Sequence, residues 1–242
     1  YFVQSFYICF HPKRGTMSNK VVITGMNMIT SLGLDLQSGW ENMVSGKNGV
    51  KRIDLFDPVG LQTQVAAQVP DAFEEYATGY VKKRMAEQTT RVTKMGYVCA
   101  KHAVQQASID FESFDKSRCA VIMGMVSTAN SSAEKGTTPK NTILKSMSNA
   151  MSAWISMEYK LRGPNFTVTS ACASSAYAIG IAYDRIKSGA ADLVITGGAD
   201  SIINREEIEG FNELYALSVN PDPEKACCPF SRDRDGFVVG EG

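Results

Sequence analysis

Residues 163–176 read GPNFTVTSACASSA, and they join a strand pattern to a helix pattern through one cysteine, Cys172. The Gly-Pro-Asn that opens the stretch is a turn signal, and residues 166–169 favour a strand. A helix pattern then covers residues 173–188, and Gly189 lies where a left-handed C-terminal cap belongs. This order of strand, cysteine and helix predicts a layered α/β domain.

The cysteine can be interpreted in two ways. A helix N-terminus stabilises a thiolate, because its unpaired N–H groups and the helix dipole favour negative charge. The alternative is a buried structural cysteine, since free cysteines are among the most buried residues. The residues alone leave both readings open. The helix spacing predicts the following core-facing residues: Ala176, Ile179, Tyr183 and Ile186.

The rest of the chain alternates strand and helix patterns, which indicates a layered α/β fold. Strand patterns cover residues 20–25, 119–124 and 191–200, and helix patterns cover residues 36–45, 72–80, 89–106, 142–160 and 206–216. In the first of these helices, we expect Trp40, Met43 and Val44 to face inward. Residues 130–140 and 221–224 are predicted loops, and residues 237–239 are a predicted strand.

The composition excludes several classes of protein. The chain has 242 residues, 44% of them hydrophobic, and a formal net charge of +0. Such a balance indicates neither a nucleic-acid partner nor an anionic membrane surface, and no apolar run reaches the roughly 18–20 residues of a spanning helix. The six cysteines show no metal-ligand spacing, so we expect no metal and a reducing compartment, the cytoplasm or an organelle stroma.

The first sixteen residues differ from the rest of the chain. Residues 1–10 are rich in aromatic side chains, and residues 11–16 are polar and basic. That order is opposite to the order in a secretory signal. We expect residues 1–16 to be a non-native or upstream extension, and residues 17–242 to form the domain.

Several stretches carry a resemblance to a known family. They are NFTVTSACASSA at 165–176, VVITGM at 21–26, WENMVSGKNGV at 40–50, ADLVITGGAD at 191–200 and PFSRDRDGFVVGEG at 229–242. In this order they resemble the N-terminal half of the β-ketoacyl-[acyl-carrier-protein] synthases, the elongating condensing enzymes of fatty acid and polyketide synthesis.

The resemblance implies a fold and a reaction. The fold is the layered αβαβα arrangement of the thiolase-like superfamily, here its N-terminal half only. Cys172 would be the nucleophile that takes an acyl group as a thioester, and its own backbone N–H would donate to the oxyanion hole. The implied partners are an acyl carrier protein, as acyl and malonyl thioesters, and a second copy in a homodimer. No cofactor is implied.

The resemblance also suggests an acyl-chain pocket. Four residues could shape it: Met125, Ser127, Met147 and Met151. Methionine suits such a pocket because it is flexible and apolar, but ordinary core packing is the alternative for a stripe at helical spacing. The basic run at 82–84 and Arg91 could meet an acidic carrier protein, although a basic run is usually a solvated face.

Members of the resembled family are about twice as long and carry two catalytic histidines in their second half. Here the histidines are His11, ahead of the first family-like strand, and His102, in a helix pattern where a satisfied structural role is expected. We therefore expect the C-terminal half to be absent. Three readings remain: a fragment of a complete synthase, one subunit of a split pair, or a non-catalytic binder of acyl groups or carrier protein.

Overall fold

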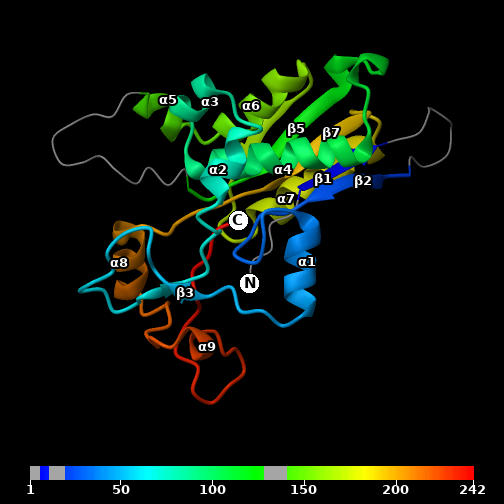
Figure 1. Ribbon diagram of the computed structural model, residues 1–242. Helices are drawn as coiled ribbons and strands as arrows, with labels where there is room; N and C mark the ends of the chain where they lie inside the picture. Colours follow the sequence, from blue (N-terminus) through cyan, green and yellow to red (C-terminus); the bar gives the residue numbers. More distant parts are fainter. Residues whose placement is uncertain (1–5, 11–19, 128–140) are drawn as a thin grey trace.

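The computed structural model describes residues 6–10, 20–127 and 141–242, the first of these ranges by its backbone alone. A five-stranded sheet with helices on both faces forms its centre (Figure 1). The strands are β1 (Phe6–Phe10), β2 (Val22–Asn27), β5 (Cys119–Gly124), β6 (Asn165–Val168) and β7 (Leu193–Gly198), with β3 (Lys51–Arg52) and β4 (Val65–Ala66) in a separate pair. The helices are α1 (Leu36–Val44), α2 (Phe73–Thr78), α3 (Lys83–Gln88), α4 (Arg91–Ala107), α5 (Thr142–Ser146), α6 (Ala150–Tyr159), α7 (Ser174–Lys187), α8 (Arg205–Glu213) and α9 (Pro223–Ala226).

The strand order in the sheet is β2-β1-β7-β5-β6. β5 runs parallel to β6 and β7, whereas β1 runs antiparallel to both β2 and β7. β5 and β7 are buried along their whole length. Their continuous apolar runs are typical of strands that are covered on both faces.

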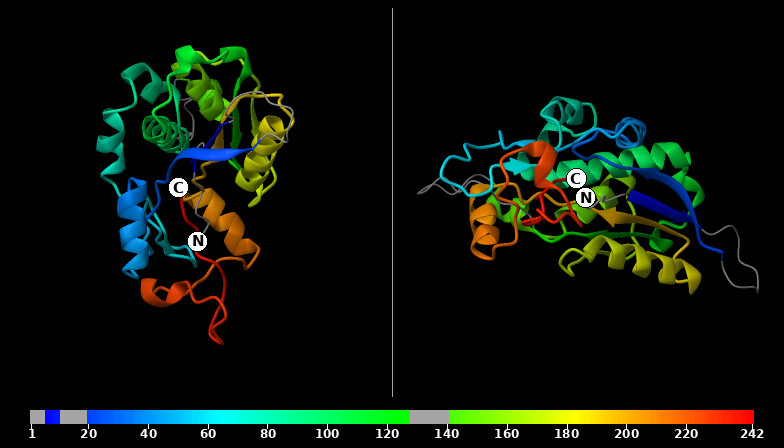
Figure 2. Two further views of the ribbon diagram at one scale, coloured as in Figure 1. Left: turned by 90° about the vertical axis from the view of Figure 1, so that its right-hand side faces the viewer. Right: turned by 90° about the horizontal axis from the view of Figure 1, so that it is seen from below.

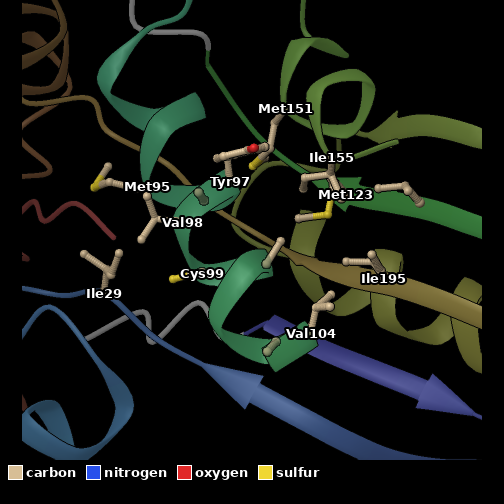
Figure 3. Close-up of a cluster of buried hydrophobic side chains, with 14 of the residues drawn as sticks. Ile29, Met95, Tyr97, Val98, Cys99, Val104, Met123, Met151, Ile155 and Ile195 are labelled. Atoms are coloured by element: carbon tan, nitrogen blue, oxygen red, sulfur yellow. The ribbon is translucent and has the colours of Figure 1, made fainter. Parts of the chain in front are cut away.

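Alternate side chains of β5 pack into the helix layers on the two faces of the sheet. Val121 and Met123 belong to the large core with α4 and α6, whereas Ala120 and Ile122 pack with α7. Figure 2 shows α4 and α7 on opposite sides of the sheet. Figure 3 shows side chains of α4, among them Val98 and Cys99, on the side of the sheet where Met123 and Ile195 lie. The described chain is therefore a three-layered α/β/α structure.

A second region lies beside the ends of the main strands and contains α1, α8, α9 and the β3–β4 pair (Figure 1). Its largest apolar cluster is formed by Ile53, Leu61, Ala66, Ile203, Ile208, Leu217 and Val239. The predicted strand at 237–239 does not enter the main sheet. Residues 237–241 form single bridges instead, Phe237 with Leu217, Gly240 with Ala67 and Glu241 with Ser201.

Most predicted elements are confirmed, but several helix faces are wrong. Trp40, Met43 and Val44 are exposed, because α1 turns its buried residue Gly39 inward. On α7 the buried residues are Ser174, Ala178, Ala182 and Ile186, whereas Ala176 and Tyr183 are exposed and Ile179 is half-buried. Residues 142–160 form two helices with a break at 147–149, and α9 lies where a loop was predicted. The loop predicted at 130–140 lies outside the described residues.

The backbone of residues 6–10 lies inside the main sheet, between β2 and β7. These residues belong to the segment that the sequence marks as an extension. Their origin stays a prediction, but their place in the structure is central. None of the helices in the described ranges is long and apolar enough to cross a membrane.

Candidate active site

Cys172 lies on a tight turn between β6 and α7. The Ala173 N–H donates to the Ser170 carbonyl at 3.0 Å, and the Ser174 N–H donates to the Ala171 carbonyl at 3.1 Å. Ala171 has a φ of 46°, a left-handed conformation that costs a residue with a side chain about 1–2 kcal/mol. Strain of this kind is typical of functional sites, where the surrounding structure holds it in place.

The buried side chain of Ser174 closes this turn. Its Oγ donates to the Ala171 carbonyl at 2.7 Å and accepts from the Ser170 N–H at 2.8 Å. Both bonds reach across Cys172, so they hold the backbone on either side of the thiol. Cys172 itself is exposed. The turn therefore presents the sulfur to solvent on a fixed backbone.

The helix that follows favours a negative charge at the turn. α7 is 14 residues long, and its N-cap residue, Ala173, makes no side-chain capping bond. The first N–H groups of a helix have no partner within the helix, and they attract anions. Arg185 and Lys187 lie in the last turn, where cations complement the dipole. A thiolate or an oxyanion at Cys172 would lie at the positive end of α7.

Two glycines let the sheet approach the start of α7 closely. A Cβ on Gly124, the last residue of β5, would overlap the backbone of Ser174 and Ser175. A Cβ on Gly198, the last residue of β7, would overlap the Ser175 Oγ and the Gly124 carbonyl. The ends of two central strands therefore press directly on the first turn of the helix that follows Cys172.

The segment that follows β5 is held from two sides. The Thr169 hydroxyl donates to the Met125 carbonyl at 3.0 Å. On the other side, Asp200 accepts from the Val126 N–H at 3.0 Å and from the Ser201 N–H at 2.9 Å. Burial raises the pKa of the Asp200 carboxyl to about 6, against the effect of these N–H donors. Asp200 was not predicted as a site residue, and its place two residues after the glycine-ended strand β7 was the available signal.

The other described cysteines differ from Cys172. Cys99 and Cys119 are buried, and burial raises the pKa of Cys99 to about 12 and that of Cys119 to about 11. Cys99 also accepts a hydrogen bond from the Asn27 amide at 3.7 Å. Cys227 and Cys228 are half-buried free thiols. Among the cysteines within residues 20–127 and 141–242, Cys172 is the exposed one.

His102 has a structural environment on α4. Its Nε2 lies 2.8 Å from the Tyr76 hydroxyl, and its ring packs against Tyr76 and Tyr80. Burial lowers the pKa of His102. The prediction of a satisfied helix histidine is confirmed, and His11 lies outside the described residues. No group of residues that could hold a metal ion occurs in the ranges 20–127 and 141–242.

The residues suggested for an acyl pocket are only partly brought together. Met125 and Met151 are buried in the same large core, which also contains Met123. Met147 is exposed at the break between α5 and α6. Ser127 lies at the end of the described segment after β5. The backbone of Met125 is linked to the nucleophile turn, because its carbonyl accepts from the hydroxyl of Thr169, three residues before Cys172.

Arg91 is not free to meet a carrier protein. Its guanidinium bonds to Glu241 through Nε at 3.1 Å and Nη2 at 2.9 Å, and to Glu74 through Nη1 at 3.0 Å. The Glu241 side chain is fully buried. This pairing across the fold was not predicted, because 150 residues separate the partners.

The fold and the exposed cysteine at a helix start define a layered α/β domain that presents a thiol at the N-terminus of a helix. A model of the beta-ketoacyl synthase N-terminal domain matches residues 18–242, and the chain belongs to this family. The 3-oxoacyl-[acyl-carrier-protein] synthase 2 of Staphylococcus aureus strain COL is 31% identical over 237 residues, which cover 94% of this chain and 56% of that protein. The chain thus spans about half the length of the curated relatives it matches.

Solved structures agree with the fold. The crystal structure of a beta-ketoacyl synthase from Burkholderia phymatum STM815 is similar with a TM-score of 0.77 and 29% identity, over 93% of this chain and 57% of that one. The ishigamide ketosynthase/chain length factor gives 0.78 and 27% over the same shares. A type II polyketide ketosynthase in complex with its acyl carrier protein gives 0.74 at 22% identity and shows the fold alone. The predicted thiolase-like α/β fold, as an N-terminal half, is confirmed.

Proposed function

We propose that this chain supplies the nucleophile of a 3-oxoacyl-[acyl-carrier-protein] synthase, with Cys172 as the residue that takes the acyl group. The observation that carries the proposal is the exposed thiol on the strained turn at the start of α7. The family match over residues 18–242 supports the same role. The proposed reaction would be a step of fatty acid or polyketide synthesis.

The first step is transfer of an acyl group between two thiols. The Cys172 thiolate attacks the carbonyl carbon of an acyl thioester, and a tetrahedral oxyanion forms. The backbone N–H of Cys172 is the proposed donor to this oxyanion. The intermediate then releases the carrier thiolate, which takes up a proton. One carbon–sulfur bond forms and one breaks, so the acyl group becomes a thioester of Cys172.

The second step requires more than this turn. A malonyl thioester must lose carbon dioxide, and the resulting enolate must attack the acyl-enzyme while positioned donors stabilise it. Removal of one such donor costs about 10²–10³ in rate. His102 of α4 is hydrogen-bonded to Tyr76 of α2, and it is the one histidine within residues 20–127 and 141–242. We expect residues 1–242 alone to be acylated without condensing, and a second polypeptide or a second half with the two histidines to complete the reaction.

Intact-mass spectrometry tests the acylation step. The chain is incubated with an acyl thioester of an acyl carrier protein, and the expected product carries one acyl mass on the peptide with Cys172. The variant Cys172→Ala should gain none, whereas Cys99→Ala should be acylated like the natural sequence. An acyl group on other cysteines, or none on Cys172, would overturn the proposal.

The same proposal includes partners and a compartment. An acyl carrier protein would deliver the substrates, and a second copy would pair through the sheet edge at β6 and the exposed Tyr177 and Tyr183 of α7. β6 supports this because it is an outer strand of the sheet with one free edge among the described strands. Light scattering on the purified chain tests the homodimer.

The proposed compartment is a reducing one, the cytoplasm or an organelle stroma. The free thiols of Cys99 and Cys119 are compatible with it.

The alternative function is a non-catalytic binder of acyl groups or carrier protein. Co-expression with a second half that bears both histidines separates the two functions. Restored condensation supports the synthase. Binding of an acyl carrier protein that persists in Cys172→Ala, without condensation under any pairing, supports the binder.

A further inference from the structure

A groove lies between α8 and the loop that precedes β4, in the second region of the fold (Figure 1). Its cavity volume is about 420 Å³, within the range of about 300–1,000 Å³ that is typical of small-molecule sites. The residues that line it are Gly60, Leu61, Gln62, Glu209, Asn212, Glu213 and Tyr215. None of them belongs to the turn that carries Cys172.

The loop wall of the groove is fixed at both of its ends. On one side, Arg205 Nη2 donates to the Asp57 carbonyl at 2.6 Å. On the other side, the Thr63 hydroxyl donates to the Ser218 carbonyl at 2.8 Å. Between these two anchors, Leu61 is buried in the apolar cluster of the second region. The groove is therefore already formed without a ligand.

Asn212 brings a buried polar side chain to the groove, and it is only 8% exposed. Its amide lies 2.8 Å from the Thr63 hydroxyl, which is also 2.8 Å from the Ser218 carbonyl. A hydroxyl has one proton and a backbone carbonyl only accepts, so this proton goes to Ser218. The Asn212 amide satisfies Thr63 when its NH₂ group donates to the hydroxyl oxygen, because the two ends of an amide have the same shape. Its carbonyl oxygen then faces the groove, and no residue of the described structure donates to it.

The lining of the groove is negatively charged. It contains two carboxylates, four residues apart on α8, and no basic side chain. Glu209 is paired with Arg205 at 3.2 Å, whereas Glu213 is exposed and has no ion pair within the described residues. Tyr215 is 85% exposed, and the face of an aromatic ring attracts cations. The lining therefore favours a cation with N–H donors.

An organic cation fits these residues better than a metal ion. Within residues 20–127 and 141–242, no group of three or more acidic, histidine or cysteine side chains could hold a metal. An ammonium group has three N–H donors and needs fewer charged partners. The exposed ring of Tyr215 and the side chain of Leu61 add apolar surface beside the acceptors.

We propose that this groove binds an alkylammonium group, a protonated primary amine at the end of a methylene chain. The ammonium donates to the Glu213 carboxylate and to the Asn212 carbonyl, while its methylene chain lies against Leu61 and the Tyr215 ring. A lysine side chain of another protein and a free diamine both carry this group. The site goes beyond the proposed acyl transfer and does not depend on Cys172.

An NMR titration of the full chain with pentane-1,5-diamine tests the site. Backbone signals of α8 and the side-chain amide of Asn212 should shift in a saturable way, with a dissociation constant on the order of 1 mM. Pentane-1,5-diol, which has the same length and no charge, should leave these signals in place. Equal binding of the diol, or no saturable shift up to about 20 mM diamine, would overturn the proposal.

Three exposed positions give variants that leave the core intact. Glu213→Gln should weaken diamine binding by about tenfold or more, because a hydrogen bond to a charged acceptor is lost. Tyr215→Leu should weaken it by about two- to fivefold, since it keeps an apolar side chain and loses the ring. Glu206→Gln is the matched control, because it removes the same charge from the first turn of the same helix, outside the groove. Equal affinities of Glu213→Gln and Glu206→Gln would overturn the proposal.

A parallel titration with Nα-acetyl-lysine N-methylamide separates the two sources of the amine. Binding as tight as that of the diamine, and equally sensitive to Glu213→Gln, supports a lysine of a protein partner. Binding at least about tenfold weaker than that of the diamine supports a free diamine, whose second ammonium then reaches Glu209. Lysine binding that Glu213→Gln does not change would place the amine elsewhere and overturn the proposed site.

Discussion

At the scale of single residues, exposure separates Cys172 from the two buried cysteines of the core. A thiol reagent reaches a buried thiol only when the structure opens locally. Burial also raises the pKa of Cys99 and Cys119, so fewer of their thiols are ionised at neutral pH. We expect iodoacetamide to label Cys172 on the order of 100-fold faster than either one.

Peptide mapping by mass spectrometry after short labelling times measures these rates. The variant Cys172→Ala should remove the fast phase, and Cys119→Ala should leave it intact. Equal rates at all three positions would contradict the role of the turn in presenting Cys172.

Asp200 gives the stability of the domain an unusual dependence on pH. Its pKa is raised to about 6 by burial, against 3.8 for a free aspartate. Between these values the folded state keeps a proton that the unfolded state releases, so this group lowers the free energy of unfolding as the pH rises. The slope is at most about 1.4 kcal/mol per pH unit.

The variant Asp200→Asn removes this slope. Its free energy of unfolding, relative to the natural sequence, should rise from pH 4 to pH 6 and become constant above pH 7. Urea denaturation at several pH values measures the difference. Asp54→Asn is the opposite control, because a hydrogen bond from Lys51 lowers the pKa of Asp54, and its stabilising effect is lost as the pH falls below about 4. A flat difference for Asp200→Asn would refute the buried titration.

At the scale of elements, the approach of β7 to α7 depends on Gly198. A methyl group there would overlap the Ser175 Oγ and the Gly124 carbonyl. We expect Gly198→Ala to destabilise the domain by about 1–3 kcal/mol, as overpacking commonly does. Because Ser175 lies in the first turn of α7, the alkylation rate of Cys172 should change as well.

Gly180 provides the matched control on the same helix. No atom lies within 4 Å of the Cβ that it would carry, within the described structure. Gly180→Ala should therefore stabilise α7 by about 0.5–1 kcal/mol through helix propensity and leave the labelling of Cys172 unchanged. The midpoint of thermal unfolding and the labelling rate of Cys172 are measured for both variants. Equal changes in Gly198→Ala and Gly180→Ala would count against a tight contact between β7 and α7.

The sequence located the elements better than it oriented them. β5 was predicted at its observed bounds, because a six-residue apolar run is typical of a buried strand and too short for most helices. The inward faces of α1 and α7 were partly wrong, as exposed Trp40 and Tyr183 show. The phase of a helix is decided by its neighbours, and α1 packs through Gly39 on Met28 instead of through its large side chains.

The site was predictable only where its chemistry is local. Cys172 and the helix after it are contiguous in sequence, so turn, strand and helix signals all point to one place. Asp200 acts on residues 74 positions away, and Glu241 on a residue 150 positions away. Such pairs arise from the path of the whole chain, and no local pattern encodes them.

At the scale of the whole molecule, the carboxylate of Glu241 binds three segments that are distant from it in the sequence. It accepts bonds from Arg91 at the start of α4, from the Val69 N–H at 3.0 Å and from the Ser201 hydroxyl at 2.7 Å. It therefore ties the second region to the main core. The buried Glu241 and the mostly buried Arg91 compensate each other's charge, and removal of one partner of such a pair is strongly destabilising.

We expect Glu241→Gln to lower the free energy of unfolding by about 2–4 kcal/mol, because the amide keeps the size of the side chain but leaves the Arg91 charge with Glu74 as its remaining carboxylate. Glu209→Gln removes an exposed pair with Arg205 and should cost less than about 0.5 kcal/mol. Urea unfolding followed by circular dichroism compares the two variants. Since Glu241 binds segments of both regions, its variant should also separate the transition into two steps, one for each region. A single transition at the natural midpoint would show that the two regions are held together by their apolar contacts and not by this carboxylate.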